Sequence, residues 1–299
     1  KSWGLYASLY SSMILIIALV VPSVQGADDG KKTALLIVDV QECFLPGGSL
    51  SVTDGNEVIP VINWIRETYK DQFSLVAVTK DWHCDRHVSF ANSHSGKTSF
   101  EDITLRYTNN GTLCLGGTVT NLTFPEAVSC PVGTGRELTQ TLWPVHCVQN
   151  VNSGPTSSKL DTTLLREADD VIINKGMSCH VDFYSAFFDI GRFGMTNLDS
   201  TLQSAGIDTI IITGLALDYC VKYTALDGRF LDYDVYVVKD ATRGVAKGTS
   251  DEALAQLTAQ KVHVIDAVDL SGVLHGAASP VAILSPAVLL TWVSAYMYF

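Results

Sequence analysis

Short apolar runs alternate with amphipathic segments along most of the chain. The runs are rich in Val, Ile and Leu, and several end at a polar residue. Such runs predict buried strands, and segments with apolar residues three or four positions apart predict helices. The predicted strands are 33–38, 74–79, 170–175, 209–213, 235–239 and 262–265. The predicted helices are 56–70, 162–168, 197–205, 220–231 and 251–260.

This alternation predicts an α/β fold of the doubly wound, three-layer, Rossmann-like kind, with a mostly parallel sheet covered by helices on both faces. Chemistry in such folds gathers at the carboxyl ends of the strands. Four reactive residues lie at or just after predicted strand ends: Asp39, Asp81, Lys175 and Cys220. Residues 102–138 interrupt the alternation, and we expect them to be an insertion without regular structure.

Cys220 stands where the strand at 209–213 turns into the next predicted helix. A thiol at a helix N-terminus is biased toward the thiolate, and the N–H groups there could hold an oxyanion. Asp39 could accept the thiol proton if its strand neighbours that of Cys220. Lys175 would lower the pKa of the thiol, and the three together suit acyl transfer. Alternatively, Cys220 is a buried structural cysteine and Lys175 a solvated turn residue.

Asp81 and His83 form a possible metal-binding pair two residues apart, and His146 could supply a third ligand. Two imidazoles and one carboxylate suit a single divalent metal, zinc foremost, with iron or manganese as alternatives. The pattern is weak on its own, since an exposed Asp-Trp-His turn has the same sequence.

Composition limits the function and the number of domains. With 299 residues, 47% of them hydrophobic, the chain can bury one substantial core or two small ones. Its formal charge of −11 and lack of clustered Lys and Arg argue against nucleic-acid binding.

The two ends of the chain indicate export. The apolar run at 13–21 is too short to span a bilayer, and small residues follow it, so residues 1–26 are interpreted as a secretory signal rather than a membrane anchor. The apolar end of the chain follows small residues, which predicts a glycosylphosphatidylinositol signal at 273–299 rather than a spanning tail. We therefore expect a domain at 27–272, held by a lipid on the extracellular face of the plasma membrane or secreted.

Two sequons and the cysteines fit this interpretation. Asn110 and Asn121 are predicted to carry glycans in the insertion. The seven cysteines leave at least one thiol free, and Cys114 and Cys130, which bracket the second sequon, are predicted to pair. The other pairings remain open.

Several separated motifs together resemble the nicotinamidases, also called pyrazinamidases, of the isochorismatase-like cysteine hydrolases. The resemblance extends from about residue 35 to residue 266, with the motifs in the order of the family. The motifs are Ile37–Gln41, Phe44 with Gly47–Leu50, Thr79–His83, Trp143–Cys147, Asn174–Gly176, Tyr184–Phe187 and Gly214–Val221.

The resemblance implies hydrolysis of the small molecule nicotinamide to nicotinate and ammonia. Asp39 would be the general base and later acid, Lys175 an electrostatic support and Cys220 the nucleophile. A cis peptide between Leu215 and Ala216, typical of the family, would aim the N–H groups of Ala216 and Cys220 at the oxyanion.

The remaining family positions would bind the metal and the ring. Asp81, His83 and His146 match the metal ligands, and the metal would bind the pyridine nitrogen or orient water. The aromatic wall around the ring would consist of Phe44, Trp143 and Tyr184. Two alternatives stay open: another amide or ureido hydrolase of the superfamily, and a catalytically silent surface binding protein. The oligomeric state is not predicted.

Overall fold

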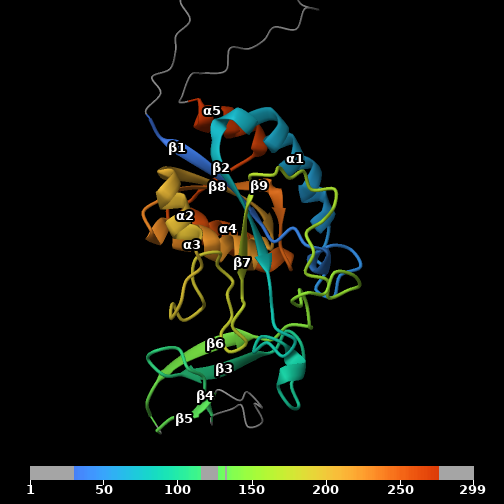
Figure 1. Cartoon of the computed structure of the whole chain (residues 1–299), viewed down its shortest axis with the longest axis vertical. Coiled ribbons are helices and arrows are strands. Elements are labelled where there is room, and N and C mark those ends of the chain that lie inside the picture. The colour runs from blue at the N-terminus through green and yellow to red at the C-terminus, as the bar shows by residue number, and fades with distance from the viewer. Residues whose placement is uncertain (1–29, 116–126, 132, 276–299) are drawn as a thin grey trace, which may run out of the picture.

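A six-stranded parallel sheet forms the centre of the protein in the computed structural model, which describes residues 30–115, 127–131 and 133–275 (Figure 1). Its strand order is β10-β9-β8-β1-β2-β7. The strands are β1 (Lys32–Val38), β2 (Phe73–Asp81), β7 (Val171–Lys175), β8 (Ile207–Leu215), β9 (Asp234–Arg243) and β10 (His263–Ile265). The helices are α1 (Val58–Tyr69), α2 (Leu198–Ala205), α3 (Lys222–Phe230), α4 (Lys247–Ala259) and α5 (Leu270–Leu274).

The middle strands β1 and β8 are apolar on both faces, so helices must cover both faces of the sheet. One core contains Ile62 of α1 and Leu270 of α5. The core on the opposite face contains Leu202 of α2, Ala225 of α3 and Leu257 of α4. The expected doubly wound α/β architecture is therefore confirmed.

The insertion is folded, which corrects the expectation of an irregular segment at 102–138. Strands β3 (Asp102–Tyr107) and β6 (Arg136–Thr141) pair antiparallel, and β4 (Cys114–Leu115) pairs with β5 (Val128–Ser129). The side chains of Ile103, Leu105 and Tyr107 alternate toward a small separate core, which explains the strand. In Figure 1 this hairpin region lies at the opposite end of the molecule from α5.

The predicted helix at 162–168 is absent, because side chains take the backbone groups that a helix would pair. Asn63 of α1 donates to the Thr163 carbonyl and accepts from the Leu165 N–H, at 2.8 Å each. The Asp161 carboxylate accepts from the Thr163 N–H at 2.7 Å. Side chains that bond nearby backbone in this way favour turns over helix.

The helix predicted to begin at Cys220 is also different, since a π-helical turn at Leu217–Val221 precedes α3. Cys220 thus lies inside this turn, and the first residue of α3 is Lys222.

The first and last described elements lie at the amino-terminal edge of the sheet. Strand β1 begins there at Lys32, and the His275 ring lies 6.4 Å from that of Tyr69, the last residue of α1. The predicted signal at 1–26, the sequon at Asn121 and most of the tail at 273–299 fall outside the described residues, although α5 runs past the predicted boundary at 272. Every helix in the described ranges is too short or too polar to span a bilayer.

Candidate active site

The four reactive residues meet because their strands are neighbours in the sheet. Strand β1 pairs with both β8 and β2, and β2 pairs with β7. Asp39 follows β1, Asp81 ends β2, Lys175 ends β7, and Cys220 lies in the turn after β8. Parallel strands bring all four to one edge.

The Lys175 ammonium lies at the centre of this group and has no side-chain exposure to solvent. Its Nζ lies 2.9 Å from Asp39 Oδ2 and 2.5 Å from Asp81 Oδ1. It donates to the Phe183 carbonyl at 3.0 Å and to Cys220 Sγ at 3.4 Å. Burial favours the neutral amine, but the two carboxylates outweigh it and raise the pKa of Lys175 well above its usual value.

Cys220 is the single free cysteine of the described residues, and it is buried. Burial, with a contribution from Asp39, raises the pKa of the Cys220 thiol well above its usual value, although Lys175 opposes the shift. Burial therefore outweighs the bias toward the thiolate that was expected from the position of Cys220, and it favours the neutral thiol. The thiol proton needs an acceptor during attack, and burial also raises the pKa of Asp39.

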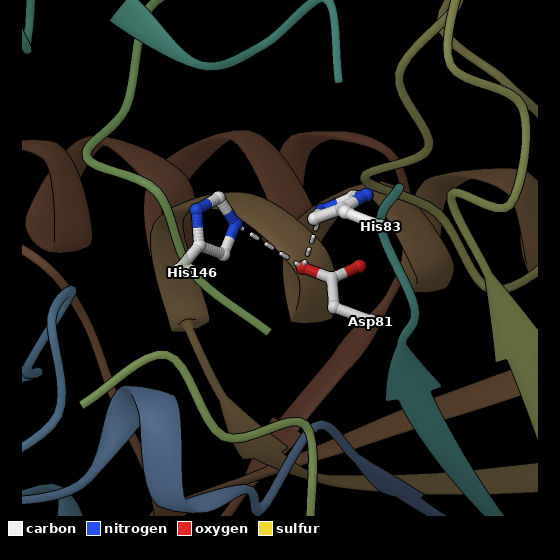
Figure 2. Close-up of side chains that lie close together, drawn as sticks. All are labelled: Asp81, His83 and His146. Atoms are coloured by element: carbon white, nitrogen blue, oxygen red, sulfur yellow. Dashed lines mark ion pairs between the residues drawn. The ribbon is translucent and has the colours of Figure 1, made fainter. Parts of the chain in front are cut away.

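Asp81, His83 and His146 point toward one another (Figure 2). Asp81 Oδ2 lies 3.4 Å from His83 Nε2 and 3.7 Å from His146 Nε2. The Nδ1 atom of each ring contacts a backbone carbonyl. His83 Nδ1 lies 3.0 Å from the Gly176 carbonyl oxygen, and His146 Nδ1 lies 2.8 Å from the Pro144 carbonyl oxygen. These carbonyls favour the tautomer in which both Nε2 atoms carry lone pairs toward Asp81. The donor set therefore fits a divalent metal.

A small cavity is lined by the Cys220 thiol and by all three members of this donor set. Phe44, Trp143 and Tyr184, predicted from the sequence, all line it, as do Ala216 and Cys220. The peptide bond between Leu215 and Ala216 is cis.

Some contributing residues carried no sequence signal strong enough to find them. Tyr219 adds a further aromatic ring to the cavity lining, and its ring centroid lies 4.7 Å from that of Trp143. Thr79 donates to Asp39 Oδ1 at 2.5 Å and accepts from the Asp39 N–H at 3.1 Å, which holds the carboxylate. Thr79 belongs to one of the motifs, but its contact with Asp39 depends on the pairing of β2 with β1, which the sequence does not show.

Gln140 of β6 connects the hairpin to the cavity wall. Its Nε2 donates to Asp182 Oδ2 at 2.9 Å and to the Tyr184 hydroxyl at 3.2 Å. Asp182 also lines the cavity and is buried. Strand β6 therefore supports the cavity wall, which the sequence did not indicate.

Cys114 and Cys130, the pair proposed from the sequence, form a disulfide. Two further disulfides join Cys43 to Cys147 and Cys84 to Cys179. The sequon residue Asn110 is exposed, so a glycan could be attached there.

The site and the fold together define an α/β cysteine hydrolase with a place for a metal. The sequence matches the isochorismatase domain over residues 33–269. The chain therefore belongs to the isochorismatase family.

Three similar proteins are informative. The Escherichia coli nicotinamidase is 36% identical over 222 residues, which are 74% of this chain and 88% of that protein. The yeast nicotinamidase, solved with the inhibitor nicotinaldehyde, is 30% identical with a TM-score of 0.65, over 78% of this chain and 99% of that one. The Pyrococcus horikoshii pyrazinamidase, solved with zinc, is 27% identical with a TM-score of 0.55, over 79% and 99% of the chains.

Proposed function

We propose that this protein is a nicotinamidase, which hydrolyses nicotinamide to nicotinate and ammonia through a thioester at Cys220. One observation carries the proposal: a single cavity is lined by the free thiol, by the Asp-His-His donor set and by aromatic rings, and the Lys175 ammonium donates to the thiol at 3.4 Å. A small aromatic ring that carries a carboxamide for the thiol to attack and a ring nitrogen for a metal is complementary to these groups. The nicotinamidase relatives support the same choice.

The acylation half follows from the contacts around Cys220. Asp39 takes the thiol proton as Sγ attacks the amide carbonyl carbon, so a carbon–sulfur bond forms and the carbonyl oxygen becomes an oxyanion. The backbone N–H groups of Ala216 and Cys220 stabilise that oxyanion. Asp39 then protonates the leaving nitrogen, the carbon–nitrogen bond breaks and ammonia departs. Lys175 balances the charge of Asp39 throughout, at 2.9 Å.

The deacylation half repeats these roles with water as the nucleophile. Asp39, again a carboxylate, takes a proton from water while the oxygen attacks the thioester carbon. Collapse of the second oxyanion breaks the carbon–sulfur bond, returns the proton from Asp39 to Sγ and releases nicotinic acid, which ionises to nicotinate in solution. One carboxylate thus serves as base, then acid, in each half.

Asp81, His83 and His146 would hold a divalent metal, zinc foremost, with iron or manganese as alternatives. When bound there, such an ion supplies Lewis acidity toward a ring nitrogen or a water oxygen. Phe44, Trp143 and Tyr184 would orient the ring, so that the amide carbon faces Sγ.

The direct test is ammonia release from nicotinamide by the glycosylated domain. We expect loss of activity in Cys220→Ala and Asp39→Ala, and in a chelated sample that zinc restores. Cys114→Ala/Cys130→Ala is the matched control, since that pair lies in the hairpin. If the folded, metal-loaded wild-type protein releases no ammonia from nicotinamide, the proposal is wrong.

Substrate preference separates the alternatives left open by the sequence. Nicotinamide and an N-carbamoyl compound should be compared in the same assay, and a higher kcat/KM for the carbamoyl compound would assign a ureido hydrolase. If Cys220 resists alkylation and neither compound is cleaved, the surface binding protein is the better description.

We further propose that the enzyme acts outside the cytosol, tethered through a lipid that replaces residues 273–299. Three disulfides in one domain are typical of oxidising compartments, and this supports the proposal. In transfected cells, a phosphatidylinositol-specific phospholipase should release the activity, and glycosidase treatment should lower the apparent mass. Activity in the medium without phospholipase would assign the secreted alternative, and activity confined to the cytosol would refute export.

A further inference from the structure

Both histidines of the proposed metal centre are followed directly by a disulfide cysteine. Cys84 follows His83 and pairs with Cys179, and Cys147 follows His146 and pairs with Cys43. We propose that these two disulfides are positioning elements of the metal site, each holding one histidine against the segment that fixes its ring. The proposal rests on the metal centre proposed above.

The bond from Cys84 to Cys179 joins the His83 segment to the loop after β7. That loop contains Gly176, whose carbonyl contacts His83 Nδ1 at 3.0 Å. Gly176 packs so closely on the ring that a Cβ there would lie 2.4 Å from His83 Cε1. The disulfide therefore spans the same two segments that meet at the ring.

The bond from Cys43 to Cys147 acts in the same way on the other histidine. Cys43 immediately precedes Phe44, whose ring centroid lies 5.5 Å from that of His146. Cys43 and Cys147 are fully buried, so this bond lies in the interior, and the residues next to it in sequence, Phe44 and His146, line the cavity.

Backbone hydrogen bonds couple the two histidine segments directly. The His83 N–H donates to the Cys147 carbonyl at 3.1 Å, and the Gln149 N–H donates to the His83 carbonyl at 2.8 Å. Four segments, 43–44, 83–84, 146–149 and 176–179, are thus joined around Asp81 by two disulfides and three hydrogen bonds, counting that of the His83 ring to the Gly176 carbonyl. Residues that orient metal ligands in this manner typically change metal affinity about 10- to 100-fold when they are removed.

The test compares zinc affinity, measured by competition with a chromogenic chelator, in the full glycosylated domain and three double variants. We expect the dissociation constant to rise about 10- to 100-fold in Cys84→Ala/Cys179→Ala and in Cys43→Ala/Cys147→Ala. Cys114→Ala/Cys130→Ala, which opens a disulfide in the hairpin, should bind zinc like the wild type. Circular dichroism establishes that each variant is folded. Unchanged affinity in either folded site variant would overturn the proposal for that bond.

A measurement on the wild type covers the case in which a variant does not fold. A phosphine reductant is added to the zinc-loaded protein, and alkylation with mass spectrometry identifies which bonds have opened. Release of zinc should follow opening of the half-buried Cys84–Cys179 bond while circular dichroism is unchanged. Zinc retained after opening, or lost only together with the fold, would overturn the proposal.

The two proposals fail differently. If the oxidised wild type does not bind zinc, iron or manganese, the metal centre is absent and the nicotinamidase mechanism loses its metal. If the wild type binds and releases ammonia but the variants bind equally well, the metal centre stands and the disulfides have no positioning role.

Discussion

Replacing Lys175 with methionine should strongly destabilise the protein, because it removes the one cation between two buried carboxylates. Lys175 Nζ lies 2.9 Å from Asp39 and 2.5 Å from Asp81, and none of the three side chains is more than 5% exposed. Removing one partner of a buried ion pair typically costs about 3–5 kcal/mol. For a domain of this size, that loss corresponds to a fall in Tm of about 6–20 °C.

The assay is thermal and urea unfolding of chelator-treated wild type and Lys175→Met, followed by circular dichroism. Chelation matters because a bound cation would compensate Asp81 in place of the lysine. Lys239→Met is the matched control: its ion pair with Asp266 has a similar distance, 3.0 Å, but the two side chains are 48% and 40% exposed. We expect a cost of about 0–1 kcal/mol there.

The pH dependence gives a second check on Lys175→Met. Without the lysine, burial keeps the pKa of folded Asp39 above its unfolded value, so stability is lost as the pH rises through the folded pKa. The deficit against wild type should be largest near neutral pH and shrink in acid. Lys175→Met/Asp39→Asn should recover part of it, because the uncompensated carboxylate is gone. A single variant less than about 1 kcal/mol below wild type would refute the reasoning.

Three further predictions test other parts of the site. Gln140→Ala frees the Tyr184 hydroxyl, so the KM for nicotinamide should rise more than kcat falls, and a pure kcat effect would contradict a role in the wall. Gly176→Ala places a methyl group against the His83 ring, so zinc affinity measured by chelator competition should fall at least about 10-fold. Burial keeps the pKa of His94 below its usual value of 6.5, so the unfolded state binds more protons and stability falls as the pH drops below about 6.5. In His94→Gln the loss of Tm between neutral and acid pH should be smaller, and an equal loss would assign the effect elsewhere.

The elements that could be predicted are those with a local pattern. The strand that ends before Asp39 is a continuous apolar run, and its position at the carboxyl edge follows from the α/β alternation alone. The sequence predicts proton transfer from Cys220 to Asp39 only if their strands are neighbours, and the pairing of β1 with β8 cannot be predicted from it. Strand order depends on contacts between distant segments, which periodicity does not report.

Other features depend on tertiary context. Ile103, Leu105 and Tyr107 alternate as a strand should, but the loop residues after them masked the signal and the partner strand β6 lies far along the chain. The helix at 162–168 fails because of Asn63, a residue of another element. The raised pKa of the Cys220 thiol likewise reflects burial, which a helix-terminus argument omits.

The positions of the first and last described elements suggest a use for the protein on a solid support. Strand β1 begins and helix α5 ends at the edge of the sheet opposite the cavity, near the start of β2 and the end of α1 (Figure 1). A bead, an electrode or a fused reporter attached at either end would leave the cavity mouth open to solution. An immobilised preparation should therefore keep the kcat/KM of the free enzyme and could serve as the recognition element of a nicotinamide sensor.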